Sequence, residues 1–124
     1  MKKSVLIAGH GSKLKGANKP INLLVEALQK KEKPIFFIAA FLEIASPTIP
    51  EGIEICIKQG AEEIVVMPYF VQAGKHVMED IPNLVQNARQ KYSNKTILLA
   101  DYLGFDERLV SLVSSRIEEA RLCQ

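Results

Sequence analysis

The sequence predicts an α/β fold, built on a parallel four-stranded sheet with helices on both faces. Four short runs of apolar, largely β-branched residues recur along the 124 residues, and a stretch with helical spacing of apolar side chains follows each one. The connections between them are short, which is typical of repeated strand–helix units with parallel strands. Right-handed crossovers then favour the flavodoxin-like strand order 2-1-3-4.

The four expected strands are short, and residues that favour turns flank them. They cover residues 4–8, 35–40, 63–67 and 96–100. Runs such as VLIA and IVVM show no alternation of polar and apolar side chains, which is typical of parallel strands covered on both faces. The sheet is therefore predicted to be the buried centre of the molecule. Functional residues are expected on the loops that follow its strands.

Helices are predicted after each strand. Thr48 and Glu51 have the spacing of a capping box at the start of the second helix. Asp80 is interpreted as the N-cap of the third helix, where Pro82 is tolerable only because it falls in the first turn. The last helix begins near Asp106. It presents four apolar side chains, Leu109, Leu112, Val113 and Ile117.

Length and composition indicate one domain, residues 1–124, with an ordinary globular balance of 48% hydrophobic and 24% charged residues. A net charge of +2 without a basic run argues against nucleic acid as a partner. No apolar run is long enough for a membrane span, and the first residues lead straight into a strand without a signal-peptide pattern. The two cysteines, Cys56 and Cys123, are expected to be free thiols in a cytoplasmic protein.

The chain contains only two histidines, and both follow predicted strands. His10 stands in the motif GHGS directly after the first strand, and His76 lies in the loop after the third. Either alone is compatible with an ordinary solvated loop residue. In the order 2-1-3-4 these strands are neighbours and their carboxyl ends meet at the switch point, where ligands bind. The fold is therefore predicted to bring His10 and His76 together.

A carboxylate flanks this pair. Glu43 lies in an otherwise apolar run after the second strand, so we expect it to be buried and either to pair structurally or to join the site. Two neutral imidazoles and a carboxylate suit a divalent transition metal with open positions, and imidazoles also accept protons near neutral pH. Metal insertion into a porphyrin-like ring needs both a metal ligand and a proton acceptor at one place. No G-x-G-x-x-G or Walker pattern is present, so no nucleotide is expected.

These residues stand in longer motifs that resemble the small class II sirohydrochlorin chelatases, the cobaltochelatase and nickelochelatase family. The resemblance covers nearly the whole chain. It rests on VLIAGHGS (residues 5–12), AFLEIASPTIP (40–50), the segment 60–82 with its PYFVQAGKHVMEDIP core, and YLG (102–104). Together the motifs are specific, whereas GHGS alone would not be.

The resemblance implies an enzyme that inserts Co²⁺, or in some members Ni²⁺ or Fe²⁺, into sirohydrochlorin without ATP, in tetrapyrrole biosynthesis of the cobalamin type. It implies that His10 is a metal ligand and the proton acceptor and that His76 is the second ligand. We expect Glu43 to join them as a catalytic residue. The tetrapyrrole would be bound by residues of two loops, Ser46, Val71, Gln72, Ala73, Gly74, Lys75 and His76.

Family members often carry glutamate at the position of Ser46, and longer members hold two such halves in one chain. One crevice offers a flat macrocycle only one wall, so we expect a symmetric homodimer. An acidic substrate is expected to be attracted by three exposed lysines near the predicted crevice: Lys13, Lys15 and Lys75. The alternative is a metal or tetrapyrrole carrier that needs the same ligands and catalyses no reaction. A histidine phosphatase is disfavoured because Gly9, not arginine, precedes His10.

Overall fold

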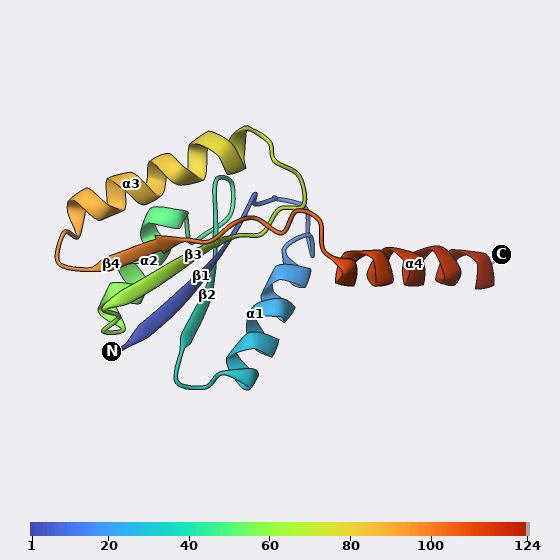
Figure 1. Cartoon of the computed structure of the whole chain (residues 1–124), viewed down its shortest axis with the longest axis horizontal. Helices are drawn as coiled ribbons and strands as arrows, with labels where there is room; N and C mark the ends of the chain where they lie inside the picture. Colours follow the sequence, from blue (N-terminus) through green and yellow to red (C-terminus); the bar gives the residue numbers. More distant parts are fainter. Residues whose placement is uncertain (124) are drawn as a thin grey trace.

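The computed structural model describes residues 1–123 and is built on a four-stranded parallel sheet in the order β2-β1-β3-β4 (Figure 1). The strands are β1 (Lys3–Gly9), β2 (Phe36–Phe41), β3 (Glu63–Pro68) and β4 (Thr96–Leu99). β1 pairs with both β2 and β3, so Val5 lies between Phe37 and Val65 in the register. The predicted order 2-1-3-4 is confirmed, with the switch point between β1 and β3.

Three helices cover the sheet. They are α1 (Lys19–Lys31) on one face, and α2 (Ile49–Lys58) and α3 (Ile81–Lys91) on the other. On the α2/α3 face Leu6, Ile64 and Val66 are fully buried among side chains of both helices. On the opposite face Ile21 of α1 packs with Ile7 and its neighbours in a smaller cluster. Both faces thus carry helices, as the apolar runs predict, although Leu98 of β4 remains 44% exposed.

The predicted start of α2 is confirmed. The Thr48 hydroxyl accepts from the Glu51 backbone N–H at 3.3 Å, and the Glu51 carboxylate accepts from the Thr48 N–H at 2.8 Å. This capping box satisfies two N–H groups that the helix leaves without a partner. Hydrogen bonding from Thr48 lowers the pKa of the Glu51 carboxyl.

The segment before α3 departs from the expected plain α-helix. His76–Asp80 form one π-helical turn, η1, and α3 continues directly from Ile81. Asp80 has helical backbone angles, and its side chain caps no N–H. Its interpretation as an N-cap is therefore wrong, because the chain is already helical four residues earlier. π turns of this kind are frequent at functional sites.

The fourth helix, α4 (Glu107–Leu122), points away from the sheet (Figure 1). None of its residues, all of which are described, is buried. Val113 and Ile117 expose 54% and 58% of their surface. Across residues 1–123 no helix has the length and apolar character needed to cross a membrane.

Candidate functional site

The carboxyl ends of β1, β2 and β3 bring His10, Glu43 and His76 together. The two imidazole rings meet edge to face with centroids 4.9 Å apart. One potential ligand atom from each of the three residues lies within 4.8 Å of the others. The predicted juxtaposition of the two histidines is thus confirmed, and Glu43 lies with them.

Backbone hydrogen bonds hold the His10 and Glu43 loops against each other. The Leu42 N–H donates to the Gly9 carbonyl at 3.0 Å, and the Glu43 N–H donates to the His10 carbonyl at 3.2 Å. Gly11 has φ of +98°, and a Cβ there would collide with the Glu43 carbonyl oxygen. Glycine is therefore required at Gly11 for both its backbone angle and its close approach to the neighbouring loop.

Glu43 is exposed, which corrects the expectation that it is buried. Its side chain is 56% accessible, and Oε1 lies 3.3 Å from Nε2 of His10. The reason is a tight turn directly after it, in which Ile44 has φ of +71° and the Ala45 N–H donates to the Glu43 carbonyl at 2.8 Å. A β-branched residue in this region is strained, and such strain clusters at functional sites. The turn directs the carboxylate out of the apolar run toward His10.

Each imidazole donates its Nδ1 proton away from the cluster. Nδ1 of His10 lies 3.0 Å from the Gly11 carbonyl, and Nδ1 of His76 lies 2.7 Å from Oδ2 of Asp80. A carbonyl or carboxylate oxygen can only accept, so these bonds assign the proton to Nδ1. In the neutral tautomer both Nε2 atoms therefore carry a free lone pair. A cation is the natural complement to two such nitrogens beside a carboxylate.

Asp80 is the functional candidate that the sequence interpretation missed. The hydrogen bond from His76 lowers the pKa of the Asp80 carboxyl. Lys75, whose Nζ lies 3.4 Å from Oδ1 of Asp80, lowers this pKa further. A carboxylate behind a ligating imidazole fixes the ring orientation and raises its basicity. The spacing of four residues between His76 and Asp80, one helical turn, was the available signal.

Two hollows flank the histidine pair. One of about 420 Å³ is lined by His10, Ser12, Tyr69 and Val71 among others. The second, of about 330 Å³, is lined by Leu42, Glu43, His76, Asp80, Asn83 and Leu84. Their size is that of small-ligand sites, and the metal-ligand cluster lies between them.

The residues expected to bind a ring lie around this edge of the sheet, all exposed except the half-buried His76. Val71 lines the larger hollow. Residues outside both hollows are Ser46, Gln72, Ala73, Gly74 and Lys75. The structure therefore brings Val71 and His76 to the hollows and leaves the other five on the surface around them.

Cys56 is excluded as a ligand. It lies on the buried face of α2, and burial raises the pKa of its thiol to about 11. A thiol held protonated in an apolar core is inert as a nucleophile and as a metal ligand. Among the described residues, His10, Glu43 and His76 form the cluster that can hold a metal ion.

A doubly wound parallel sheet with two histidines and a carboxylate at its switch point defines a class: an α/β protein with a site able to hold a divalent metal. The chain belongs to the CbiX family, whose model matches residues 4–120. The resemblance drawn from its motifs is thereby confirmed.

Relatives of two lengths match. The chain is 35% identical over 120 residues to a sirohydrochlorin ferrochelatase of Priestia megaterium, covering 96% of this chain and 45% of that protein. It is 31% identical to a sirohydrochlorin cobaltochelatase of Methanosarcina barkeri, covering 96% and 97% of the two chains. The crystal structure of the sirohydrochlorin chelatase SirB from Bacillus subtilis subspecies spizizenii in complex with cobalt has 33% identity and a TM-score of 0.89, covering 96% of this chain and 51% of that one. The chain thus spans about half of the longer relatives and nearly all of the shorter one.

Proposed function

We propose that this protein is a sirohydrochlorin chelatase that inserts Co²⁺, and also Fe²⁺ or Ni²⁺, into its tetrapyrrole without ATP. The observation that carries the proposal is the convergence of two imidazoles and one carboxylate, with one potential ligand atom of each within 4.8 Å of the others. Sirohydrochlorin as substrate, and cobalt or iron as metal, are supported by the names of the relatives. Nickel rests on the imidazole ligands, which accept all three metals.

In the proposed reaction two pyrrole N–H protons leave the ring as one divalent cation enters, so the charge of the ring does not change. His10, Glu43 and His76 hold the incoming cation, its substrate, at the mouth of the hollows. When the cation passes from Nε2 of His10 to the ring, that nitrogen becomes free to accept the pyrrole protons, one after the other, releasing each to water, because Nδ1 is already committed to the Gly11 carbonyl. Glu43, 3.3 Å from that nitrogen, stabilises the imidazolium that forms.

The ring is proposed to lie over the exposed loop that follows β3. Val71 borders the larger hollow, and Lys75 and Ser46, exposed outside it, would supply polar groups to the ring. Gln72, Ala73 and Gly74 complete this loop, with His76 at its end. Because the hollows are open and a flat ring has two faces, we propose that a homodimer supplies the second wall. Free Cys56 and Cys123 support a cytoplasmic setting.

An anaerobic absorption assay tests the proposal. Sirohydrochlorin is mixed with Co²⁺, Fe²⁺ or Ni²⁺ and a catalytic amount of protein, without nucleotide. Formation of many equivalents of metallated ring per protein, faster than without protein, is the expected result. One equivalent of bound metal or ring with no turnover would identify the carrier instead. Absence of both binding and turnover would end the proposal.

A further inference from the structure

The three proposed metal ligands are divided between the two hollows that flank them. His10 lines the hollow of about 420 Å³, which we call the His10 hollow. Glu43 and His76 line the hollow of about 330 Å³, the His76 hollow. One potential ligand atom of each residue nevertheless lies within 4.8 Å of the others. The ligand cluster therefore separates the two hollows, and a substrate in either hollow borders it.

The two hollows differ in charge. Glu43 and Asp80 place two carboxylates in the lining of the His76 hollow. Lys75, whose Nζ lies 3.4 Å from Oδ1 of Asp80, offsets one of these charges, so one negative charge remains. Among residues 1–123, no carboxylate lines the His10 hollow. A divalent cation is therefore attracted more strongly to the His76 hollow.

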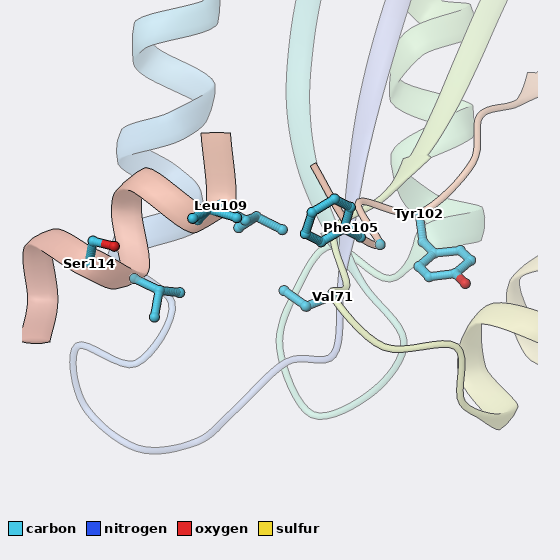
Figure 2. Close-up of a pocket in the computed structure, with 8 residues that line it drawn as sticks. Val71, Tyr102, Phe105, Leu109 and Ser114 are labelled. Atoms are coloured by element: carbon cyan, nitrogen blue, oxygen red, sulfur yellow. The ribbon is translucent and has the colours of Figure 1, made fainter. Parts of the chain in front are cut away.

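The His10 hollow borders a wider apolar surface. Val71 lines it and also lines an open groove of about 650 Å³ at the foot of α4, where Figure 2 shows Val71, Phe105 and Leu109 gathered. Lys13 and Lys15 are exposed in the loop between β1 and α1, on the same side of the cluster as His10. A flat ring that carries carboxylates needs apolar area with cations near its margin, and the His10 side provides both.

Asn83 belongs to the His76 hollow as well. It lies on α3 three residues beyond Asp80, and its side chain is exposed. Residues three or four apart share one face of a helix, which is why His76, Asp80 and Asn83 line the same hollow. Amide and carboxylate oxygens accept hydrogen bonds from the water shell of a divalent cation. This face of the helix is thus suited to a cation that is still hydrated.

We propose that the divalent cation enters through the His76 hollow while the ring occupies the His10 hollow, so that substrates of opposite charge reach the ligand cluster from two sides. The inference rests on the proposed function and adds Asn83 as a positioning residue for the hydrated cation. The cation exchanges water for Glu43 and His76 first, and the displaced water leaves by the same hollow. His10 then shares the cation on the side of the ring, where the pyrrole protons are released.

Stopped-flow binding of Co²⁺ to the intact protein, without any ring and at low ionic strength, tests the entry side. Quenching of tyrosine fluorescence reports binding, because Tyr69 lines the His10 hollow beside the cluster. Asn83→Lys and Asn83→Asp place opposite charges in the His76 hollow. Asn87→Lys is the matched control, since Asn87 is exposed one turn further along α3 and lines a different hollow. Ala17→Lys places the same charge in the His10 hollow.

Asn83→Lys is expected to slow Co²⁺ association roughly five-fold and Asn83→Asp to accelerate it roughly two-fold or more, because each acts on a double charge at short range. Asn87→Lys and Ala17→Lys should both change the rate by less than either Asn83 variant. A faster rate in Asn83→Asp cannot result from misfolding, so this variant decides the matter if Asn83→Lys does not fold. Stronger slowing by Ala17→Lys than by Asn83→Lys, or no response to the two Asn83 variants, would overturn the proposal.

Steady-state insertion rates give a second readout. Asn83→Lys is expected to raise the KM for Co²⁺ roughly five-fold and to leave kcat and the KM for sirohydrochlorin nearly unchanged. Equal rises in the two KM values would place both substrates on one side of the cluster and would contradict the proposal. The Co²⁺ kinetics need no ring, so a wrong entry side and a failed chelatase assay remain distinct.

Discussion

The two histidines occupy equivalent places at the switch point but are held in different ways. His10 donates to the Gly11 backbone carbonyl, within a loop that hydrogen bonds fasten to the Glu43 turn. His76 donates to the Asp80 carboxylate, one helical turn further along the chain. One ring is therefore oriented by neutral backbone and the other by an ionised side chain.

This difference in hydrogen-bond partner suggests different roles for the two histidines. A carboxylate behind an imidazole fixes the orientation of the ring and strengthens it as a metal ligand, whereas a neutral backbone carbonyl only orients the ring. In the proposed function, His76 is therefore the firmer metal ligand. His10, whose Nε2 lies 3.3 Å from Glu43, is the proposed proton acceptor as well as a ligand.

Removal of either imidazole should have the largest effect. His10→Ala and His76→Ala are each expected to lower the insertion rate roughly 100-fold or more, because each removes a proposed metal ligand and His10→Ala also removes the proposed proton acceptor. Both side chains are partly exposed, so the fold should persist. The chelatase assay with circular dichroism checks this. Full activity in either variant would remove that histidine from the mechanism.

A methyl group at Gly11 should disturb the contact between the His10 loop and the Glu43 turn and leave His76 in place. Gly11→Ala places a Cβ against the Glu43 carbonyl, so we expect a loss of roughly 2–4 kcal/mol in the free energy of unfolding and misplacement of Glu43. Gly16→Ala is the matched control: it also has positive φ, but its Cβ meets open space. It should cost only roughly 1 kcal/mol. Denaturant unfolding measures both, and equal losses would show that backbone angle alone matters.

Asp80 gives the test on the His76 side. Asp80→Asn keeps the shape of the side chain but removes the charge, so we expect roughly 10- to 100-fold weaker Co²⁺ binding. Glu79→Gln, next to it and exposed, is the control and should change little. Calorimetric titration with Co²⁺ measures the affinities. Equal binding by both variants would reduce Asp80 to a structural residue.

Activity should fall as the solution becomes acidic, because an imidazolium can neither bind a cation nor accept a proton. Asp80 is not the cause of this loss. The pKa of its carboxyl is lowered by the hydrogen bond from His76, so it remains ionised well below the range in which imidazoles titrate. The acid-side loss should therefore persist in Asp80→Asn. A rate profile that is flat from pH 8 to 5 would argue against histidine in either role.

Raising the salt concentration should have the smallest effect on activity. It should weaken the attraction of the substrate by lysines near both His10 and His76. Lys13 and Lys15 are exposed near His10, and Lys75, paired with Asp80, stands beside His76. Screening of their attraction for a polycarboxylate ring should raise KM by a few-fold and leave kcat nearly unchanged. Initial rates at 50 and 500 mM salt check this. An unchanged KM would leave the lysines as ordinary surface.

The fold followed from the sequence because its signals are local and repeated. The apolar runs at residues 4–8 and 63–67 lie within β1 and β3, and the handedness of crossovers then leaves few strand orders. The position of α4 could not be predicted in the same way. Its apolar side chains predict that it packs, but they do not specify a surface, and none of them is buried in the structure.

The site was predictable where it depended on topology. Strand order alone places His10 beside His76. The exposure of Glu43 and the contact of Asp80 with His76 were not predicted, because both depend on backbone geometry that residue type does not reveal. The turn at Ile44 exposes Glu43, and the π turn makes Asp80 a partner of His76 instead of a helix cap.

The central claim is that His10, Glu43 and His76 together hold the incoming metal. Crystals grown with Co²⁺, measured on both sides of the cobalt absorption edge, test it most directly. The account predicts one anomalous peak between Nε2 of His10, Oε1 of Glu43 and Nε2 of His76, and none there in crystals of His76→Ala. A well-occupied peak elsewhere with this cluster empty, or a peak unchanged in His76→Ala, would contradict it.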